Sequence, residues 1–175
     1  LLKDTFPDLR IHISTQAAVT NTYYADLLSG ADRVTLPREF SLDHVREFIE
    51  KVGTRLETEV FVHGALCFSY SGQCLFSSFL GGRSGNRGLC AQSCRKRYNE
   101  SYLLSTKDLC LVHKIPELIT AGVSSLKIEG RLRSPQYTAL ATRVYRLAVD
   151  SYYAGHFRLP EKELKDLALE FNREF

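Results

Sequence analysis

The sequence predicts an α/β fold in which short parallel strands alternate with helices. Short apolar segments typical of buried strands recur along the 175 residues, and most are followed by apolar residues at helical spacing. A composition of 44% hydrophobic and 25% charged residues is that of a chain able to bury a sizeable core. This order of elements favours parallel strands joined by right-handed crossovers.

The first part of the chain contains three predicted strands and two predicted helices. The strands are expected over the segments 9–14, 33–36 and 57–62. The first helix is predicted over 17–28, ended by Gly30. The second is predicted over 42–52, because Ser41 is a favoured N-cap residue and Gly53 a favoured stop.

The same alternation resumes in the second part of the chain. Strands are expected over the segments 102–105 and 124–129. A helix is predicted over 107–121 with a restart at Pro116, and a long helix from Pro135 with Ser134 as its N-cap. A final helix is expected from Glu161 to about residue 171. Five strands are too few to close a barrel of eight, although each β-α unit would fit one.

Composition also bears on where the protein works. The chain contains no Met and begins with Leu1, so we expect it to be a piece of a longer protein. No stretch approaches the roughly 18 consecutive apolar residues of a membrane span, and no secretory leader is visible. The expected compartment is therefore the cytoplasm, where thiols stay reduced and no membrane partner is needed.

Polar residues follow each predicted strand. In parallel α/β folds ligands bind at the carboxyl ends of strands, so these clusters are candidates for one binding rim. The alternative is that loops simply begin with polar residues. The clusters are 14–16, 38–39, His63, 105–107, and Glu129 with Arg131.

The strand and helix pattern breaks from residue 64 to about residue 100, a segment that contains four of the five cysteines. A segment without a hydrophobic pattern of its own needs a staple, and in a reducing compartment thiolates point to an iron–sulfur cluster or zinc. Only Cys90 and Cys94 have the short spacing of a zinc knuckle, which favours iron–sulfur. Buried free thiols are the alternative. The cysteines are Cys67, Cys74, Cys90, Cys94 and Cys110.

Positive charge is concentrated on the same segment. The formal net charge of +3 permits a nucleic-acid partner without requiring one. Between residues 83 and 97 there is no carboxylate, and the basic side chains there are candidates for phosphate contacts. They are Arg83, Arg87, Arg95, Lys96 and Arg97.

Two runs carry a resemblance to a known family. Residues 59–67 (EVFVHGALC), followed after four residues by 72–77 (GQCLFS), resemble the signature of the collagenase-like peptidase family, the U32 group. Phe76 stands where an aliphatic residue is usual in that signature. The likeness covers most of the chain, including the segments 14–16, 83–95, 107–109 and 127–131.

The resemblance implies a TIM-barrel-like domain of which residues 1–175 are the later β-α units. Residues 64–100 would be a cysteine-rich insertion, and residues 134–175 would form the C-terminal helices. Similar proteins were first labelled proteases. Others carry a 4Fe-4S cluster on four cysteines and support hydroxylation of tRNA uridine, rRNA cytidine or the ubiquinone ring, with prephenate as the hydroxyl donor for RNA.

Family precedent also suggests ligands for the cluster. It favours Cys67, Cys74, Cys90 and Cys110, whereas local spacing would pair Cys90 with Cys94, which we keep as the substitute ligand. Zinc, or no bound group in this piece, is the alternative to the cluster.

The resemblance further suggests roles in catalysis. Glu59 or His63 would handle protons, and Glu129 and Arg131 would orient a carboxylated donor. Each of these residues could instead have a structural role.

Two other hypotheses stay open. One is a peptidase, for which the sequence offers no HExxH or GxSxG motif but a cysteine and His63. The other is a non-catalytic, cluster-bearing chain that acts with a partner chain.

Overall fold

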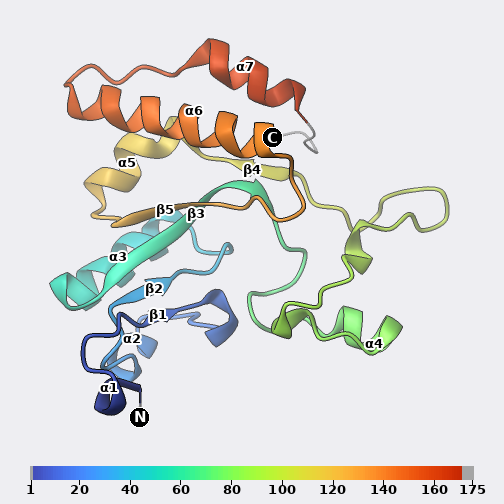
Figure 1. Cartoon of the computed structure of the whole chain (residues 1–175), viewed down its shortest axis with the longest axis horizontal. Helices are drawn as coiled ribbons and strands as arrows, with labels where there is room; N and C mark the ends of the chain where they lie inside the picture. The colour runs from blue at the N-terminus through green and yellow to red at the C-terminus, as the bar shows by residue number, and fades with distance from the viewer. Residues whose placement is uncertain (1, 171–175) are drawn as a thin grey trace.

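The structure, a computed structural model, describes residues 2–170 and contains a mixed five-stranded sheet with helices packed against it (Figure 1). In the part of the chain described, no helix combines the length and the apolar character needed to cross a membrane. The strands are β1 (His12–Ile13), β2 (Arg33–Thr35), β3 (Glu57–Ala65), β4 (Asp108–Cys110) and β5 (Ser125–Ile128).

The helices range from single turns to a long C-terminal helix. Short 3-10 turns lie at 15–17, 53–55, 85–87, 93–95 and 112–114. The α-helices are α1 (Leu2–Thr5), α2 (Tyr24–Leu27), α3 (Leu42–Val52), α4 (Phe76–Gly81), α5 (Ile115–Thr120), α6 (Pro135–Tyr153) and α7 (Glu161–Leu169).

Strand β3 is the centre of the sheet. It pairs in parallel with β2 and with β5, and β2 pairs in parallel with β1. The last residues of β3 pair instead with β4, which is antiparallel, in the register His63↔Cys110 and Ala65↔Asp108. The prediction of an α/β fold is therefore confirmed, whereas the prediction of parallel strands is wrong for β4.

The two best-defined predicted helices are confirmed with their caps. The hydroxyl of Ser41 accepts a hydrogen bond from the amide of His44 at the start of α3. That of Ser134 accepts one from the amide of Tyr137 at the start of α6. Each cap pairs an amide that a helix leaves unsatisfied in its first turn, so both helices begin where the sequence predicts.

The predicted helix over 17–28 is wrong for most of its length. Ala18 has a left-handed backbone with φ of 52°, which ends the turn at 15–17. The side chain of Asn21 then accepts a hydrogen bond from the amide of Tyr23, an alternative to helical pairing, and α2 begins only at Tyr24. The helix predicted to end near residue 171 is described as α7, and residue 171 itself lies outside the described residues.

Two further predictions between residues 102 and 121 are wrong. The segment 102–105 is not a strand, and the extended segment is β4, because β3 runs to Ala65 and offers its last residues as a partner. The first residues of the helix predicted over 107–121 form β4 and a 3-10 turn instead. Helix α5 begins only at Ile115, beside Pro116.

The hydrophobic core lies between one face of the sheet and helices α3, α5 and α6 (Figure 1). Alternate residues of β3 point into it, as the two-residue period of a strand requires. Helix α7 adds the buried Leu167 against α6. The buried core residues of the sheet and these helices include Val34, Val60, Val62, Phe48, Ile115, Ala141 and Val144.

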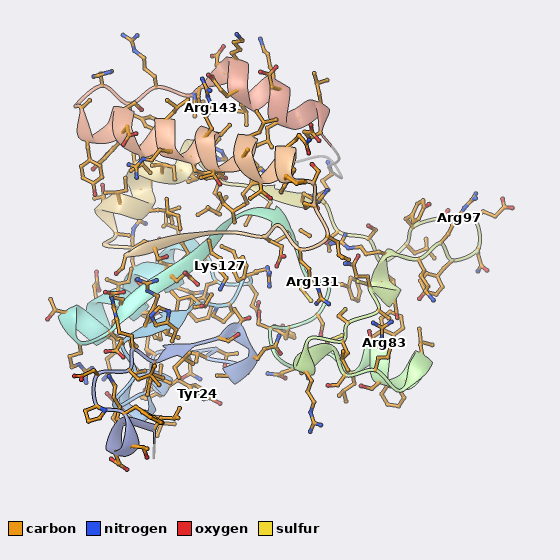
Figure 2. All side chains as sticks on the ribbon, viewed as in Figure 1. Tyr24, Arg83, Arg97, Lys127, Arg131 and Arg143 are labelled. Carbon is orange, nitrogen blue, oxygen red and sulfur yellow. The ribbon has the colours of Figure 1, made fainter. Side chains whose placement is uncertain are left out.

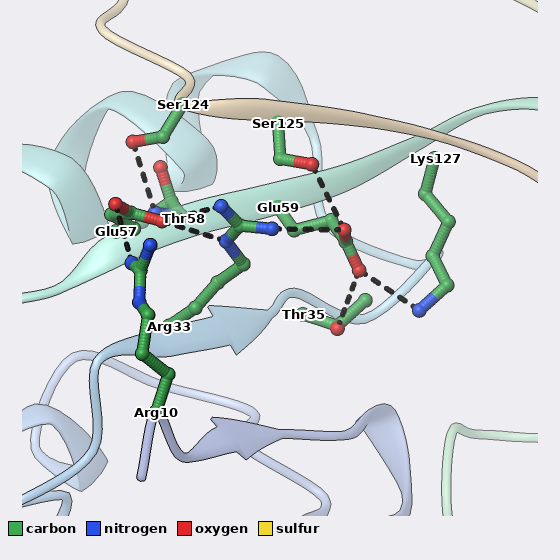
Figure 3. A network of polar contacts seen from close by, with 9 residues as sticks. All are labelled: Arg10, Arg33, Thr35, Glu57, Thr58, Glu59, Ser124, Ser125 and Lys127. Carbon is green, nitrogen blue, oxygen red and sulfur yellow. Dashed lines mark hydrogen bonds and ion pairs between the residues drawn. The ribbon is translucent and has the colours of Figure 1, made fainter. Parts of the chain in front are cut away.

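The opposite face of the sheet is polar (Figure 2 and Figure 3). Glu59 accepts hydrogen bonds from Thr35, Ser125 and Lys127, each within 2.9 Å. Burial alone would raise the pKa of Glu59, but these three bonds, led by the one from Lys127, outweigh it and lower the pKa. Glu59 is therefore an ionised member of a structural network.

Gly64 allows the end of β3 to approach the turn after β5. Its φ is 101°, a conformation that side-chain-bearing residues rarely adopt, and a Cβ there would collide with the backbone oxygen of Glu129. We expect Gly64→Ala to lower the free energy of unfolding by at least about 1–3 kcal/mol. Chemical denaturation of the full-length protein checks this, with Gly155→Ala as the control, because that glycine also has a positive φ but open space around it.

Candidate functional site

A cavity of about 580 Å³ lies where the carboxyl ends of strands meet the segment between β3 and β4. In Figure 1 this segment, with α4, stands to one side of the sheet. Thr15 and Gln16 line the cavity after β1, Arg38 after β2 and Glu129 after β5. Three of the polar clusters predicted to share one rim thus contribute to a single cavity, as expected for the carboxyl ends of parallel strands.

Four thiols line this cavity. Cys67 and Cys74 lie in the loop that joins β3 to α4, Cys90 follows the 3-10 turn at 85–87, and Cys94 lies in the turn at 93–95. Gly85 lies beside two of them, since a Cβ there would be in ordinary contact, 3.7 Å from the Cβ of Cys90 and 3.9 Å from the backbone oxygen of Cys74. All four cysteines are free thiols.

Backbone and hydroxyl groups position the sulfur of Cys90. The amide of Gln92 donates to Sγ of Cys90 at 3.3 Å, and the hydroxyl of Ser77 lies 3.9 Å from the same atom. Ser77 is buried at the start of α4 and also accepts from the amide of Ala91 at 3.0 Å. Donors directed at sulfur stabilise a thiolate and tune an iron–sulfur cluster.

The thiols are close enough to interact electrostatically. Burial raises the pKa of Cys94, and its three neighbouring thiols raise it further, against the opposing effect of Arg95. Within residues 2–170, no three His, Cys, Asp or Glu side chains are arranged to hold a single metal ion. Cysteine thiolates are also the ligands of iron–sulfur clusters, in which each thiolate binds a different iron.

Cys110 lies elsewhere. It is the last residue of β4, opposite His63 of β3, and it does not line the cavity. Burial raises the pKa of its thiol, and this outweighs the opposing effects of the backbone of Val112 and the hydroxyl of Tyr145 on α6. The structure therefore brings Cys94 together with the first three cysteines and places Cys110 within the sheet, on β4.

The floor of the cavity carries an ion pair. Nη2 of Arg38 lies 2.9 Å from Oε2 of Glu129, and the guanidinium stacks 3.6 Å from the ring centroid of Phe61. Oε1 of Glu129 accepts from the amide of Arg131 at 3.0 Å. Arg131 extends towards the cysteine segment, where it donates to the backbone oxygen of Gly88 (Figure 2).

The basic residues predicted to contact phosphate divide into two groups. Arg95 donates to the backbone oxygens of Leu66 and Thr106 and to the hydroxyl of Ser105, so it holds the two ends of the cysteine segment together. The other four are exposed, and Figure 2 shows Arg83 and Arg97 on the outer side of this segment. These four are Arg83, Arg87, Lys96 and Arg97.

Comparison with known proteins gives the family. The sequence model of peptidase family U32 matches residues 1–175. The chain belongs to peptidase family U32. The resemblance seen in the two signature runs is therefore confirmed over the whole length of the chain.

Curated U32 relatives have names of more than one kind. The chain is 38% identical to tRNA hydroxylation protein P1 of Bacillus subtilis over 96% of its own length and 44% of the relative. It is 38% identical to the 23S rRNA 5-hydroxycytidine C2501 synthase of Escherichia coli, over 86% of this chain and 25% of the relative. It is 35% identical to a collagenase of Porphyromonas gingivalis, over 95% of this chain and 46% of the relative.

The chain spans less than half the length of these three relatives. No solved structure matches it significantly.

His63, predicted to handle protons, is buried in β3 and does not line the cavity. Its ring packs against Tyr137 and Tyr145 of α6, with ring centroids 5.8 and 5.5 Å away, and its Nδ1 lies 3.4 Å from the hydroxyl of Tyr145. Burial lowers its pKa to about 4, the nearby Asp108 opposes this, and Arg133 adds to it. The imidazole is therefore neutral at pH 7.

This burial predicts a pH dependence of stability. The folded pKa of His63 is about 4 and the ordinary value 6.5, so the unfolded chain binds more protons between these limits. Stability should be fully present above about pH 6.5 and fall, by on the order of 3 kcal/mol, as the pH approaches 4. Denaturation curves of the full-length protein and His63→Gln at several pH values check this. Equal slopes for the two proteins would contradict it.

The sequence predicts no role for Arg38. It places this residue in a polar cluster after a strand, and such a cluster indicates a position in the fold but no function. Of the four residues assigned catalytic roles, Glu129 and Arg131 line the cavity, whereas Glu59 and His63 do not.

Proposed function

We propose that this chain holds the 4Fe-4S cluster of a U32 enzyme that hydroxylates tRNA or rRNA. The observation that carries the proposal is the meeting of four free thiols around one cavity at the carboxyl ends of strands. The names of the tRNA and rRNA hydroxylation relatives support the reaction. The ligands would be Cys67, Cys74, Cys90 and Cys94, with Cys94 in the place that family precedent suggested for Cys110.

The residues of the cavity have separable roles in this proposal. A bound cluster would supply one-electron chemistry. The amide of Gln92 and the hydroxyl of Ser77 would fix the thiolate of Cys90, and Arg95 would hold the loop that carries Cys67. The exposed basic side chains at 83, 87, 96 and 97 would contact RNA phosphates.

Several broader features belong to the same proposal. The sheet would be the later part of a TIM-barrel-like domain, in which the polar face of β2, β3 and β5 points inward; β4 departs from an all-parallel barrel. The segment 64–100 would be a cysteine-rich insertion, and the hydroxyl donor a carboxylate such as prephenate. The cytoplasm would keep the thiols reduced. A partner chain would bind to exposed surface on this part of the protein.

Nucleoside analysis tests the proposed reaction. Total tRNA and rRNA from cells with and without the full-length gene would be digested and compared by mass spectrometry. The proposal expects one hydroxylated pyrimidine nucleoside to disappear with the gene and to return on complementation. Unchanged nucleosides in both RNA classes would refute RNA hydroxylation while leaving the presence of a cluster to be measured separately.

Peptide hydrolysis is the second candidate, favoured by the relative named collagenase. It would use a cavity cysteine as the nucleophile. The purified full-length protein would be assayed on gelatin, with Cys67→Ala and a metal chelator as controls. Hydrolysis that resists the chelator and is lost in Cys67→Ala would favour the peptidase; absence of hydrolysis would remove it.

A further inference from the structure

The cavity wall is positively charged apart from its thiols. Four arginines line it, against one carboxylate, that of Glu129. One arginine, Arg133, is neutralised by the buried carboxylate of Asp108 at 2.5 Å. The three remaining guanidinium groups outnumber the one carboxylate, so the cavity can accommodate the charge of bound thiolates and of an anionic ligand.

Most of these guanidinium groups are already committed to the protein. Arg95 donates to two backbone oxygens and a hydroxyl, and Arg131 donates to a backbone oxygen of the cysteine segment. Arg38 and Arg131 each make one guanidinium hydrogen bond among the described residues, although the group has five N–H donors. Arg131 is exposed, whereas Arg38 is mostly shielded from solvent.

The surroundings of Arg38 make it rigid and poorly hydrated. Its side chain is 16% exposed, and its guanidinium carbon lies 3.6 Å from the ring centroid of Phe61. Burial lowers its pKa, although the group stays charged. A desolvated guanidinium with unused donors beside a cavity is a strong binding group for a planar oxyanion, because charged hydrogen bonds are worth more away from water.

We infer that Arg38 binds the oxyanion of a substrate in the cavity, next to Cys67, and that Glu129 holds its guanidinium in place until that ligand arrives. The inference deepens the proposed function and rests on it for the identity of the ligand. The oxyanion is the carboxylate of the small donor or a phosphate of the RNA. This reverses the role expected for Glu129, which becomes a competitor of the ligand for Arg38.

Binding of two probes to the full-length protein tests the inference. Prephenate would be titrated by calorimetry and an RNA stem–loop by fluorescence anisotropy. We expect Arg38→Gln to weaken one of them about tenfold or more, and Arg38→Lys to weaken it less, since lysine keeps the charge but loses the planar fork. Loss of prephenate binding alone identifies the carboxylate, and loss of RNA binding alone identifies the phosphate. Unchanged binding of both probes would overturn the inference.

Two further variants guard the interpretation. Glu129→Gln removes the competing charge and should strengthen binding of the same probe several-fold, whereas a donor-orienting role for Glu129 predicts weaker binding. Arg46→Gln is the matched control, because Arg46 forms an equally short 2.9 Å ion pair on the exposed face of α3. Its binding should equal that of wild type. These titrations measure ligand binding and not hydroxylation. Their outcome therefore tests the role of Arg38 even if the nucleoside analysis finds no change in RNA hydroxylation.

Discussion

Replacement of Cys94 by Ser is expected to abolish the iron–sulfur chromophore of the full-length protein purified without oxygen. Cys94 lines the cavity with three other thiols, and a cluster with one serine in place of a thiolate is held far less firmly. Iron and sulfide content should fall from about four atoms of each per chain to a small fraction of that value. Absorption spectra and iron analysis measure the loss.

Cys110→Ser is the matched control for this prediction. The Cys110 thiol lies on β4 against Tyr145 and outside the cavity, so this variant should keep its colour and its iron. A colourless Cys110→Ser together with a coloured Cys94→Ser would show that Cys110 is the fourth ligand and that the sheet end rearranges to deliver it. Bound zinc in the wild-type protein would contradict the cluster itself.

Asp108→Ala is expected to have the largest effect on stability. Its carboxylate accepts from Arg133 at 2.5 Å, and the two side chains are 1% and 7% exposed. Removal of the carboxylate leaves the guanidinium of Arg133 buried without its ion-pair partner, which costs about 3–5 kcal/mol. Because β4 and the turn before α6 meet at this pair, both the sheet end and the cavity wall should loosen. Thermal and chemical denaturation of the full-length protein measure the change.

The exposed pair Asp43–Arg46 supplies the comparison. Asp43→Ala removes a carboxylate from an ion pair of similar length whose members are 88% and 44% exposed, so it should cost no more than about 1 kcal/mol. Equal losses of stability in the two variants would mean that burial does not determine the strength of the Asp108 pair.

The fold was predictable where local chemistry determines it. Ser41 and Ser134 mark helix starts that the structure reproduces, because an N-cap bond depends on residues within one turn. The failures need knowledge of distant partners. Residues 108–110 become a strand only because β3 extends to Ala65. The left-handed backbone of Ala18 is a local feature, but alanine rarely adopts it, so its residue type gave no signal.

The candidate site shows the same division. The four cysteines of the segment 64–100 all line the cavity, and so do Glu129 and Arg131, which were predicted as residues that follow a strand. The burial of His63 against two tyrosines of α6 involves residues more than 70 positions away, so no local pattern could reveal it. Arg38 needed Phe61 and Glu129 beside it before its role could be inferred.

One measurement tests the central claim that the cavity thiols support RNA hydroxylation. Cells lacking the full-length gene would be complemented with wild type, Cys94→Ser or Cys110→Ser, and the hydroxylated pyrimidine nucleosides of their RNA quantified by mass spectrometry. The account predicts that wild type and Cys110→Ser restore the same nucleoside and that Cys94→Ser does not. Full restoration by Cys94→Ser, at equal protein level, would contradict it.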